Sequence, residues 1–493
     1  MATTKKLTSS QKDFFAKVAQ AAFSNPFGET RLELDLQISE TDHNLERMEI
    51  TDRAIAEVDK QLQQLDKAGV SKLAHFGSGD AKLMHTAYLF EIYHQLQYDF
   101  DRHIQQQIKG GDKPQPVQFA DKAMTAFYRR GFSELDACKY LAFFFQMRRA
   151  FYFIDQNLIG DCPSMRQFRC HLWNNLFTHD IKWFEEHLWD RMEDFSTLIL
   201  GETGSGKGAA AAAIGCSGHI PFDDKTGKFK ESFTKAFISR NLSQYPETLI
   251  ESELFGHSKG AFTGAIGNYQ GVFSQCTPHG AIFLDEIGEL TTPVQIKLLQ
   301  VLQERCFSPV GSHEKLRFSG RVIAATNRSI GKLRQQGKFR DDFFYRLCSD
   351  VITVPSLRQR VGENPKELTM LLERVIERII GEKKKTLATE IKSILDKNLG
   401  KSYHWPGNVR ELEQAVRRIL LSGSYAGEQF EVGMEIHEQI HAKLVTGEAP
   451  AQELLCDYCK MLYQRFGTYE QVASTTGLDR RTVKKYIEAS RLE

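Results

Sequence analysis

The feature that most constrains this 493-residue chain is a strand, a glycine-rich loop and a helix in direct succession. Apolar residues 197–200 run into a Gly-x-x-x-x-Gly-Lys loop, and the alanine-rich stretch 209–213 follows. The glycines let backbone N–H groups converge on phosphate oxygens, the helix N-terminus adds a favourable dipole, and the lysine reaches the β and γ phosphates. The pattern predicts a nucleotide-phosphate site at Gly201, Glu202, Thr203, Gly204, Ser205, Gly206, Lys207 and Gly208. Because Gly208 replaces the usual Ser or Thr, this loop lacks a magnesium-binding hydroxyl.

Two further apolar runs end in polar residues, as buried parallel strands do at a ligand site. Residues 280–284 lead into Asp285 and Glu286, and residues 321–326 lead into Asn327. We expect Asp285 to hold Mg²⁺, directly or through water, and Glu286 to polarise the attacking water. Asn327 is expected to orient the γ-phosphate or that water.

Three arginines downstream are candidates for nucleotide contacts. Arg340 and Arg346 are six residues apart. They are either arginine fingers for a neighbouring subunit in an oligomeric ring or a pair of surface salt bridges. Arg410 lies in the stretch 405–412, which is typical of a loop entering a helix, and it is placed to sense nucleotide from a lid.

A short uncharged segment, residues 260–265, lies between the phosphate loop and the acidic pair. It holds one aromatic ring and one hydroxyl between glycines, so it cannot perform acid–base chemistry. An exposed Phe262 is costly unless it contacts a partner, whereas the alternative is a tight turn with Phe262 folded into the core.

Taken together, residues 158–421 resemble the AAA+ domain of bacterial enhancer-binding proteins, the ATP-driven activators of sigma-54 RNA polymerase. The resemblance is carried by the phosphate loop, the acidic pair, residues 251–257, 259–265 and 405–412, and Asn327. It implies binding of ATP and Mg²⁺, an ATPase ring expected to be a hexamer, and sigma-54 RNA polymerase as partner. The loop that contacts sigma-54 would be Gly260, Ala261, Phe262, Thr263, Gly264 and Ala265.

The resemblance also assigns roles within the site. Arg340 and Arg346 match the arginines that act in trans, Asn327 the first sensor and Arg410 the second. Asn241 matches the residue that restrains the catalytic glutamate, although the preceding segment, 216–235, is longer than usual in the family. Gly208 is a departure, since many members carry Glu there.

The C-terminus has the spacing of a helix-turn-helix. Ala473 is a small residue for a helix crossing, Gly477 suits the turn, Val483 is a core position, and Asp479 can N-cap the second helix. Its outer face would contact double-stranded DNA through Arg480, Arg481, Thr482, Lys484 and Lys485. The alternative is a small helical tail with a solvated basic face. By resemblance, the module dimerises.

Residues 1–155 read as helical and do not resemble the family's common sensor modules; by position they should regulate the ATPase. The fold prediction is multidomain: an all-α N-terminal domain, an α/β AAA+ core with a helical lid, and a C-terminal helix-turn-helix. The expected boundaries are 1–155, 156–357 for the α/β subdomain, 358–425 for the lid, 426–450 for a linker, and 451–493.

Composition narrows the setting. Sixty-four basic and 63 acidic residues give a net charge of +1, so any nucleic-acid contact must come from a local patch. The N-terminus lacks a signal-like apolar region, and no uncharged run reaches membrane-spanning length. We expect a bacterial cytoplasmic regulator that binds upstream DNA and opens sigma-54 promoters. The alternatives are a nucleotide-gated DNA-binding repressor and a remodelling ATPase of another AAA+ branch.

Overall fold

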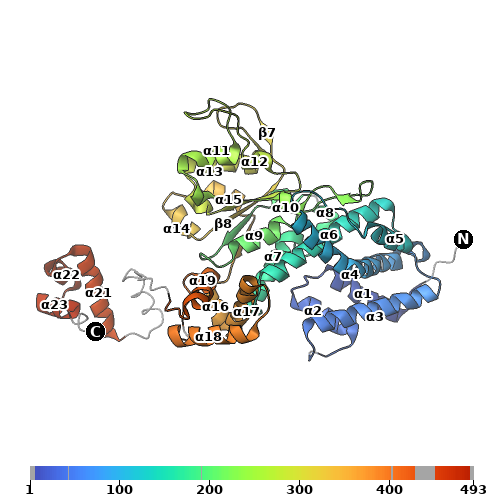
Figure 1. The fold of residues 1–493 in the computed structure, drawn as a ribbon, viewed down its shortest axis with the longest axis horizontal. Helices are drawn as coiled ribbons and strands as arrows, with labels where there is room; N and C mark the ends of the chain where they lie inside the picture. The colour runs from blue at the N-terminus through green and yellow to red at the C-terminus, as the bar shows by residue number, and fades with distance from the viewer. Residues whose placement is uncertain (1–5, 43, 190, 401–402, 428–449, 489–493) are drawn as a thin grey trace. The chain divides into compact units, whose positions relative to one another are not determined.

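The computed structural model describes residues 6–42, 44–189, 191–400, 403–427 and 450–488 (Figure 1). The chain forms two compact units, one of residues 1–394 with 401–423 and the other of residues 395–400 with 424–493. The linker predicted at 426–450 lies almost entirely outside the described residues. No helix in the described part of the chain is long and apolar enough to cross a membrane.

The N-terminal region is helical, as predicted. Sequence signals place its helix starts: Thr8 and Gln11 form a capping box before the first helix, and the Ser133 side chain accepts from the Asp136 N–H. Val58, Leu62 and Leu65 form the buried face of α3. The helices are α1 (Ser9–Phe23), α2 (Glu29–Ser39), α3 (Arg47–Lys67), α4 (Ser78–Gly110), α5 (Ala120–Arg130), α6 (Glu134–Asn157), α7 (Pro163–Phe177) and α8 (Ile181–His187).

The α/β core is built on a five-stranded sheet in the order β4-β5-β8-β1-β9, and every pairing in it is parallel. The strands are β1 (Thr197–Leu200), β4 (Phe237–Asn241), β5 (Ala281–Asp285), β8 (Arg321–Thr326) and β9 (Asp350–Thr353). Each apolar run that the sequence indicated is therefore a strand. The polar residues that follow β1, β5 and β8 lie at one edge, because parallel strands end together.

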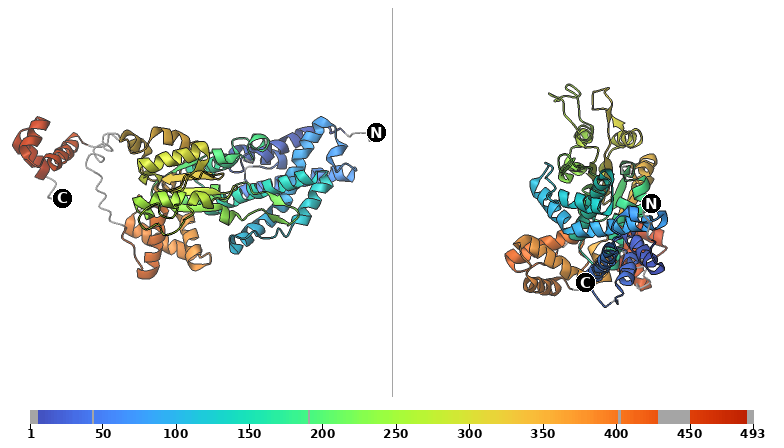
Figure 2. Two further views of the ribbon diagram at one scale, coloured as in Figure 1. Left: turned by 90° about the horizontal axis from the view of Figure 1, so that it is seen from above. Right: turned by 90° about the vertical axis from the view of Figure 1, so that its right-hand side faces the viewer.

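Alternate residues of each strand bury on opposite faces of the sheet. On β5, Ile282 and Leu284 face the helices α11 (Glu247–Phe255), α12 (Val272–Gln275), α13 (Thr292–Glu304), α14 (Ile330–Gln335) and α15 (Asp341–Leu347). Phe283 instead joins one continuous hydrophobic core with α9 (Lys207–Gly215) and the N-terminal helices. Figures 1 and 2 show those helices alongside this part of the α/β core. The core thus continues across the boundary predicted at residue 155.

The longer segment noted at 216–235 contains a hairpin, β2 (Phe222–Asp223) and β3 (Lys228–Phe229), and the short helix α10 (Phe233–Ala236). Phe229 stacks on Phe145 of α6, with ring centroids 4.0 Å apart and planes at 17°. The extra residues therefore join the ATPase core to the N-terminal helices.

The lid comprises α16 (Leu357–Glu363), α17 (Lys366–Ile380), α18 (Lys385–Leu399) and α19 (Asn408–Ser422). A two-stranded sheet, β6 (Cys306–Phe307) and β7 (Leu316–Arg317), lies near the loops at the top of Figure 1.

The second unit, described separately, contains α21 (Ala451–Phe466), α22 (Tyr469–Thr476) and α23 (Arg480–Glu488). Its small core holds Cys459, Leu462, Val472 and Val483, with Ala473 packed against them. Gly477 ends α22 with φ at +72°, and Asp479 Oδ1 accepts from the N–H groups of Arg481 and Thr482 at 2.9 and 3.0 Å.

Candidate nucleotide site and loop

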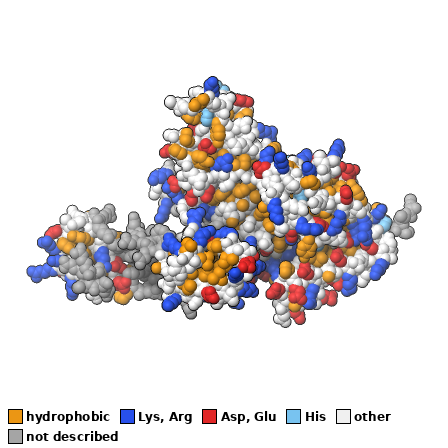
Figure 3. Space-filling model, viewed as in Figure 1, with side chains coloured by type: hydrophobic (Ala, Val, Ile, Leu, Met, Phe, Trp, Pro, Cys, Tyr) orange, Lys and Arg blue, Asp and Glu red, His pale blue; other side chains and the backbone are white. Residues whose placement is uncertain are grey.

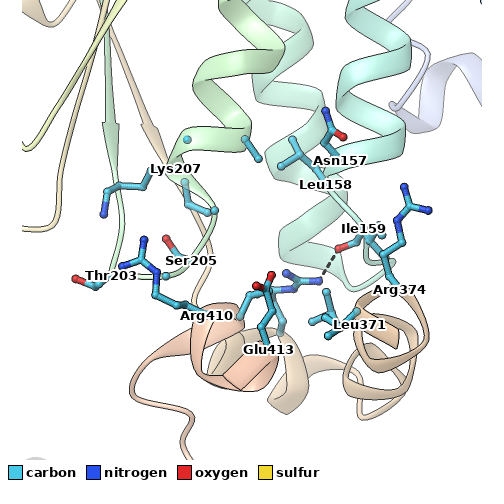
Figure 4. A pocket seen from close by; sticks show the side chains of 18 of the residues that line it. Asn157, Leu158, Ile159, Thr203, Ser205, Lys207, Leu371, Arg374, Arg410 and Glu413 are labelled. Atoms are coloured by element: carbon cyan, nitrogen blue, oxygen red, sulfur yellow. Dashed lines mark hydrogen bonds between the residues drawn. The ribbon is translucent and has the colours of Figure 1, made fainter. Parts of the chain in front are cut away.

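One pocket of about 450 Å³ brings together most of the predicted site residues (Figure 4). Its walls come from the phosphate loop, the ends of β4 and β5, the lid, and the turn between α6 and α7. The predicted residues that line it are Thr203, Gly204, Ser205, Gly206, Lys207, Gly208, Asn241, Asp285, Glu286 and Arg410. Gly201, Glu202, Asn327, Arg340 and Arg346 do not line it.

The phosphate loop has the backbone that its glycines predict. Gly204 and Gly206 have φ of +76° and +111°, a region that favours glycine. Lys207 Nζ donates to the Gly201 carbonyl oxygen at 2.9 Å. Ser205 Oγ lines the pocket, is buried, and has no hydrogen-bond partner among the described residues. A buried hydroxyl at a pocket wall fits a polar ligand such as a nucleotide phosphate.

Glu202 was predicted to contact nucleotide, but its side chain has other partners. Arg358 Nη1 and Asn408 Nδ2 each donate to Glu202 Oε2 at 3.1 Å. Glu202 thus joins the phosphate loop to the base of the lid instead of lining the pocket.

The acidic pair lies at the end of β5, where Asp285 pairs in register with Asn241 of β4. Glu286 has φ of +58° and ψ of +47°, a left-handed conformation that is unfavourable for a residue with a side chain. Its N–H donates to Asp285 Oδ1 at 3.0 Å, and its Oε2 accepts from the Asn327 N–H at 3.4 Å. Both carboxylates line the pocket beside the phosphate loop.

Asn327 lies outside the pocket lining, although it contacts the phosphate loop. Its Nδ2 donates to Thr203 Oγ1 at 2.9 Å. Asn241 does line the pocket, but its Oδ1 accepts from the Ser243 N–H and hydroxyl at 3.0 and 2.7 Å. In this structure Glu286 therefore contacts Asn327, and Asn241 is engaged with its own strand end.

The loop into α19 contacts the phosphate loop through a residue that sequence reasoning missed. Asn408 is fully buried with φ of +54°, and its Nδ2 donates to the Thr203 carbonyl oxygen at 3.1 Å. The Val409 N–H donates to the Gly204 carbonyl oxygen at 3.1 Å. These bonds place the exposed Arg410 at the pocket mouth (Figure 4).

The other end of the pocket was also missed, and it combines apolar side chains with polar ones such as Asn157 and Arg374. Leu158 and Ile159, in the turn after α6, lie with Phe168 of α7 and Leu371 of α17 (Figure 4). The sequence signalled only a change of character near residue 158. Apolar side chains with a few polar groups among them, opposite a phosphate loop, are suited to a nucleotide base.

Arg340 and Arg346 have partners outside the pocket. Arg340 pairs with Asp342, with 2.7 Å between Nη2 and Oδ2, and Arg346 donates to the Leu302 carbonyl oxygen at 2.9 and 2.7 Å. Neither reaches the phosphate loop of its own chain.

Residues 260–265 form a closed tip. The Gly260 N–H donates to the Ala265 carbonyl oxygen at 2.9 Å, and the Ala265 N–H to that of Phe262 at 3.0 Å. The Phe262 ring meets the His257 ring at 4.9 Å between centroids, and its side chain is 37% exposed. Thr263 is exposed as well. The alternative of a core Phe262 does not hold.

Comparison with known proteins agrees with this geometry. Residues 185–353 match the family model described as the Sigma-54 interaction domain, and residues 363–433 match that of the AAA+ ATPase lid domain. The fold and pocket are thus those of an AAA+ ATPase domain that binds nucleotide. In these two regions the chain is thus similar to sigma-54-dependent enhancer-binding activators.

Two named relatives match this chain over a similar number of residues. The nitrogen fixation protein AnfA of Azotobacter vinelandii is 36% identical over 298 residues, 59% of this chain and 52% of its own. The DNA-binding transcriptional regulator NtrC of Azospirillum brasilense is 37% identical over 262 residues, 53% and 49%. The chain therefore spans about half the length of these relatives. The crystal structure of NtrX from Brucella abortus with ADP is 19% identical, covers 75% of this chain and 80% of its own, and has a TM-score of 0.41.

Proposed function

We propose that this protein couples ATP hydrolysis in a ring of subunits to the remodelling of sigma-54 RNA polymerase at promoters. The observation that carries the proposal is the pairing of one nucleotide pocket with a separate, exposed tip at Phe262 and Thr263. The pocket supplies the acids for hydrolysis, whereas the tip offers an exposed contact surface and no reactive group. This separation suits an ATPase that hydrolyses ATP at one site and acts on its partner protein through another.

Within the pocket, Lys207 and the loop N–H groups would bind the phosphates, and Glu286 would polarise the attacking water. Asn327, beside both Glu286 and Thr203, is placed to relay the presence of the γ-phosphate. Asn241 borders Asp285 and would restrain the site from the neighbouring strand. Arg410 would sense the nucleotide from the lid.

The residues present fit a Mg²⁺ ion through one carboxylate. Asp285 is half-buried at the pocket wall and supplies hard oxygen ligands, while Gly208 supplies none. Asp285 would hold the ion together with phosphate oxygens, and the ion would neutralise charge on them. Water ligands would replace the hydroxyl that the loop lacks.

Ring assembly is supported by Arg340 and Arg346, which the family resemblance assigns to the nucleotide site of the neighbouring subunit. Neither lines its own pocket. In a ring, expected to be a hexamer, they would reach the γ-phosphate of the adjacent subunit as arginine fingers.

The C-terminal unit supports DNA binding as a dimeric helix-turn-helix. Asp479 caps α23, whose Arg480, Arg481, Lys484 and Lys485 side chains are exposed, and Figure 3 shows basic groups at the edge of this unit. Thr482 is half-buried, and its backbone N–H donates to Asp479 Oδ1 at 3.0 Å. We infer that the module would hold upstream double-stranded DNA in the bacterial cytoplasm.

The test is open-complex formation by sigma-54 polymerase in vitro. Thr263→Ala and Phe262→Ala should abolish it while ATP turnover stays within about twofold of wild type, because the tip is remote from the pocket. The control is Thr389→Ala, an exposed threonine on α18. Full activation by both tip variants would refute the proposal. Intact DNA and ATP binding without any activation by the wild type would favour the repressor alternative.

A further inference from the structure

A second cavity, of about 640 Å³, lies among the N-terminal helices. Its walls come from the α1–α2 connection and from α3, α4, α6 and α7. The volume is in the range of small-molecule sites. Nothing in the ATPase cycle or the polymerase contact proposed above uses it.

One wall of this cavity is aromatic and carries a buried donor without an acceptor. Phe27 stacks on Phe151 at 5.3 Å between centroids, and Trp173 meets the Phe27 ring edge-on at 6.1 Å. Trp173 is 2% exposed, lines the cavity, and its Nε1–H has no hydrogen-bond partner among the described residues. An unpaired buried N–H is costly, so an acceptor from a ligand would remove that cost.

The cavity also holds two kinds of arginine. Arg31 and Arg148 are each paired with a carboxylate, Asp35 at 2.8 Å and Asp101 at 2.5 Å. Arg47 instead donates to the carbonyl oxygens of Pro26 and Gly28, at 2.9 and 2.6 Å.

Arg169 resembles Arg47. It donates to the carbonyl oxygens of Leu158 and Gly160, at 3.2 and 2.6 Å, and its Nε is buried without a partner among the described residues. Carbonyl oxygens satisfy N–H groups but bring no countercharge. Burial lowers the pKa of both guanidinium groups. Asp155 and Asp161 offset part of the Arg169 charge, yet neither forms an ion pair with it in the described part of the chain.

We propose that this cavity binds a small organic acid, an aromatic or medium-chain carboxylate, against Trp173, Arg47 and Arg169. The apolar body would pack on the Phe27 and Phe151 rings. The carboxylate would accept from Trp173 Nε1 and form the direct ion pair that neither arginine makes in the described part of the chain.

Helices α6 and α7 each contribute residues to both this cavity and the nucleotide pocket. On α6, Arg148 and Phe151 line the cavity, and the helix ends where Leu158 and Ile159 line the nucleotide pocket. On α7, Phe168 lines the nucleotide pocket and Trp173 the cavity.

The turn between α6 and α7 is held by the lid. Glu367 Oε1 accepts from the Cys162 N–H at 2.9 Å, and Arg360 Nη2 donates to the Ile159 carbonyl oxygen at 2.5 Å (Figure 4). A ligand that shifts α6 against α7 would therefore alter the base end of the nucleotide pocket. Acid binding and nucleotide binding should be coupled, and the coupling must be reciprocal.

Calorimetric titration of the full chain with benzoate, phenylacetate and octanoate tests the site, with the three matched amides as neutral controls. At least one acid should bind with a Kd of about a millimolar or tighter, and its amide at least tenfold more weakly, about the effect of a charge-assisted hydrogen bond. Absence of binding by all three acids, or equal binding of the amides, would overturn the proposal.

Two variants locate the site. Trp173→Phe keeps the ring and removes the donor, and it should weaken the acid about tenfold. The matched control is Trp183→Phe, since Trp183 is 50% exposed on α8. Arg47→Gln is the second variant, in case Trp173→Phe folds poorly. Wild-type affinity in the folded variants would place the acid elsewhere and refute the assignment.

The coupling is measured as the Kd of a fluorescent ADP analogue with and without saturating acid. A change of about fivefold or more is expected, and an unchanged Kd would refute the coupling. These experiments use neither sigma-54 nor hydrolysis, so their failure would leave the proposed function standing.

Discussion

Arg149, a fully buried residue of the N-terminal helix α6, donates from Nη1 to the carbonyl oxygen of Cys216 at 2.6 Å. Cys216 is the C-cap of α9, the helix that begins at Lys207 of the phosphate loop. Nη2 donates to the Gly218 carbonyl oxygen, also at 2.6 Å. A cation at a helix C-terminus complements the helix dipole, so α6 holds the far end of the nucleotide-binding helix.

Arg149→Ala should destabilise the whole unit by about 3 kcal/mol, because it leaves two buried carbonyls unpaired and removes packing over the Phe145 ring. Urea unfolding followed by circular dichroism measures the loss. The control is Arg129→Ala, an exposed ion pair with Asp66, which should change stability by less than about 1 kcal/mol. Equal effects of the two variants would show that the bonds to Cys216 and Gly218 do not carry the stability.

Stability should fall in mild acid partly through His103. Burial, and secondarily the Arg149 charge, lowers the pKa of His103 from 6.5 to about 4. Below pH 6.5 His103 binds a proton in the unfolded chain but stays neutral in the folded chain. Its contribution therefore destabilises the folded state as the pH falls toward 4. When the pH falls from 6.5 to 5, the free energy of unfolding should decrease by about 1.5 kcal/mol less in His103→Gln than in the wild type. Identical losses in paired urea titrations would contradict this.

Glu286→Gln should slow ATP hydrolysis about a hundredfold or more, because the amide cannot polarise the attacking water. Nucleotide affinity should stay within about threefold. A coupled-enzyme assay and fluorescent nucleotide binding separate the two effects. Glu289→Gln, three residues on and paired with Arg328, is the matched control and should turn over normally. Rapid hydrolysis by Glu286→Gln would remove it from the chemical step.

Arg340 should act on the neighbouring subunit's nucleotide. Glu286→Gln and Arg340→Ala proteins should each be inactive alone, yet a 1:1 mixture should regain about a quarter of wild-type ATPase, because one interface in four then has both groups intact. Mixing Glu286→Gln with Asn327→Ala is the control, since both residues serve the same subunit's site. Absence of recovery in the test mixture would place Arg340 in cis. Recovery in the control would show that regained activity does not report groups shared between subunits.

DNA contact by α23 is expected to depend on salt. Lys485→Ala should weaken binding to upstream DNA and lower the slope of log K against log salt by about one. Lys460→Ala, on α21 and 3.6 Å from Asp457, is the control. Fluorescence anisotropy over a salt series measures both, and an unchanged slope for Lys485→Ala would argue for a merely solvated basic face.

The predicted residues that line the pocket include several with a local sequence signature. Gly204 and Gly206 must take positive φ, and Asp285 ends an apolar strand; both rules act over a few residues. Asn408 was missed because its role depends on lid and phosphate loop meeting, more than 200 residues apart in the chain. The base end at Ile159 was missed for the same reason.

The N-terminal helices show the limit of pattern reading most clearly. Helical periodicity predicted α3 and α6, but it could not reveal that Phe145 would pack on Phe229 across 84 residues of chain. Burial of Trp173 beside a cavity likewise follows from the packing of α1, α2, α3, α4, α6 and α7. Periodicity gives the buried face of a helix and leaves its neighbour undetermined.

The continuous core between the N-terminal helices and the α/β sheet bears on how such a chain can be recombined. A domain boundary normally falls where few contacts cross, so one domain can be replaced by another in evolution or by engineering. Here truncation before Leu158 would expose the hydrophobic side chains of Ile214, Phe229 and Phe233, and the exposed apolar patch would promote aggregation. A functional graft of the N-terminal helices would therefore have to carry the 222–229 hairpin with it, because the helices and the α/β core share one hydrophobic core.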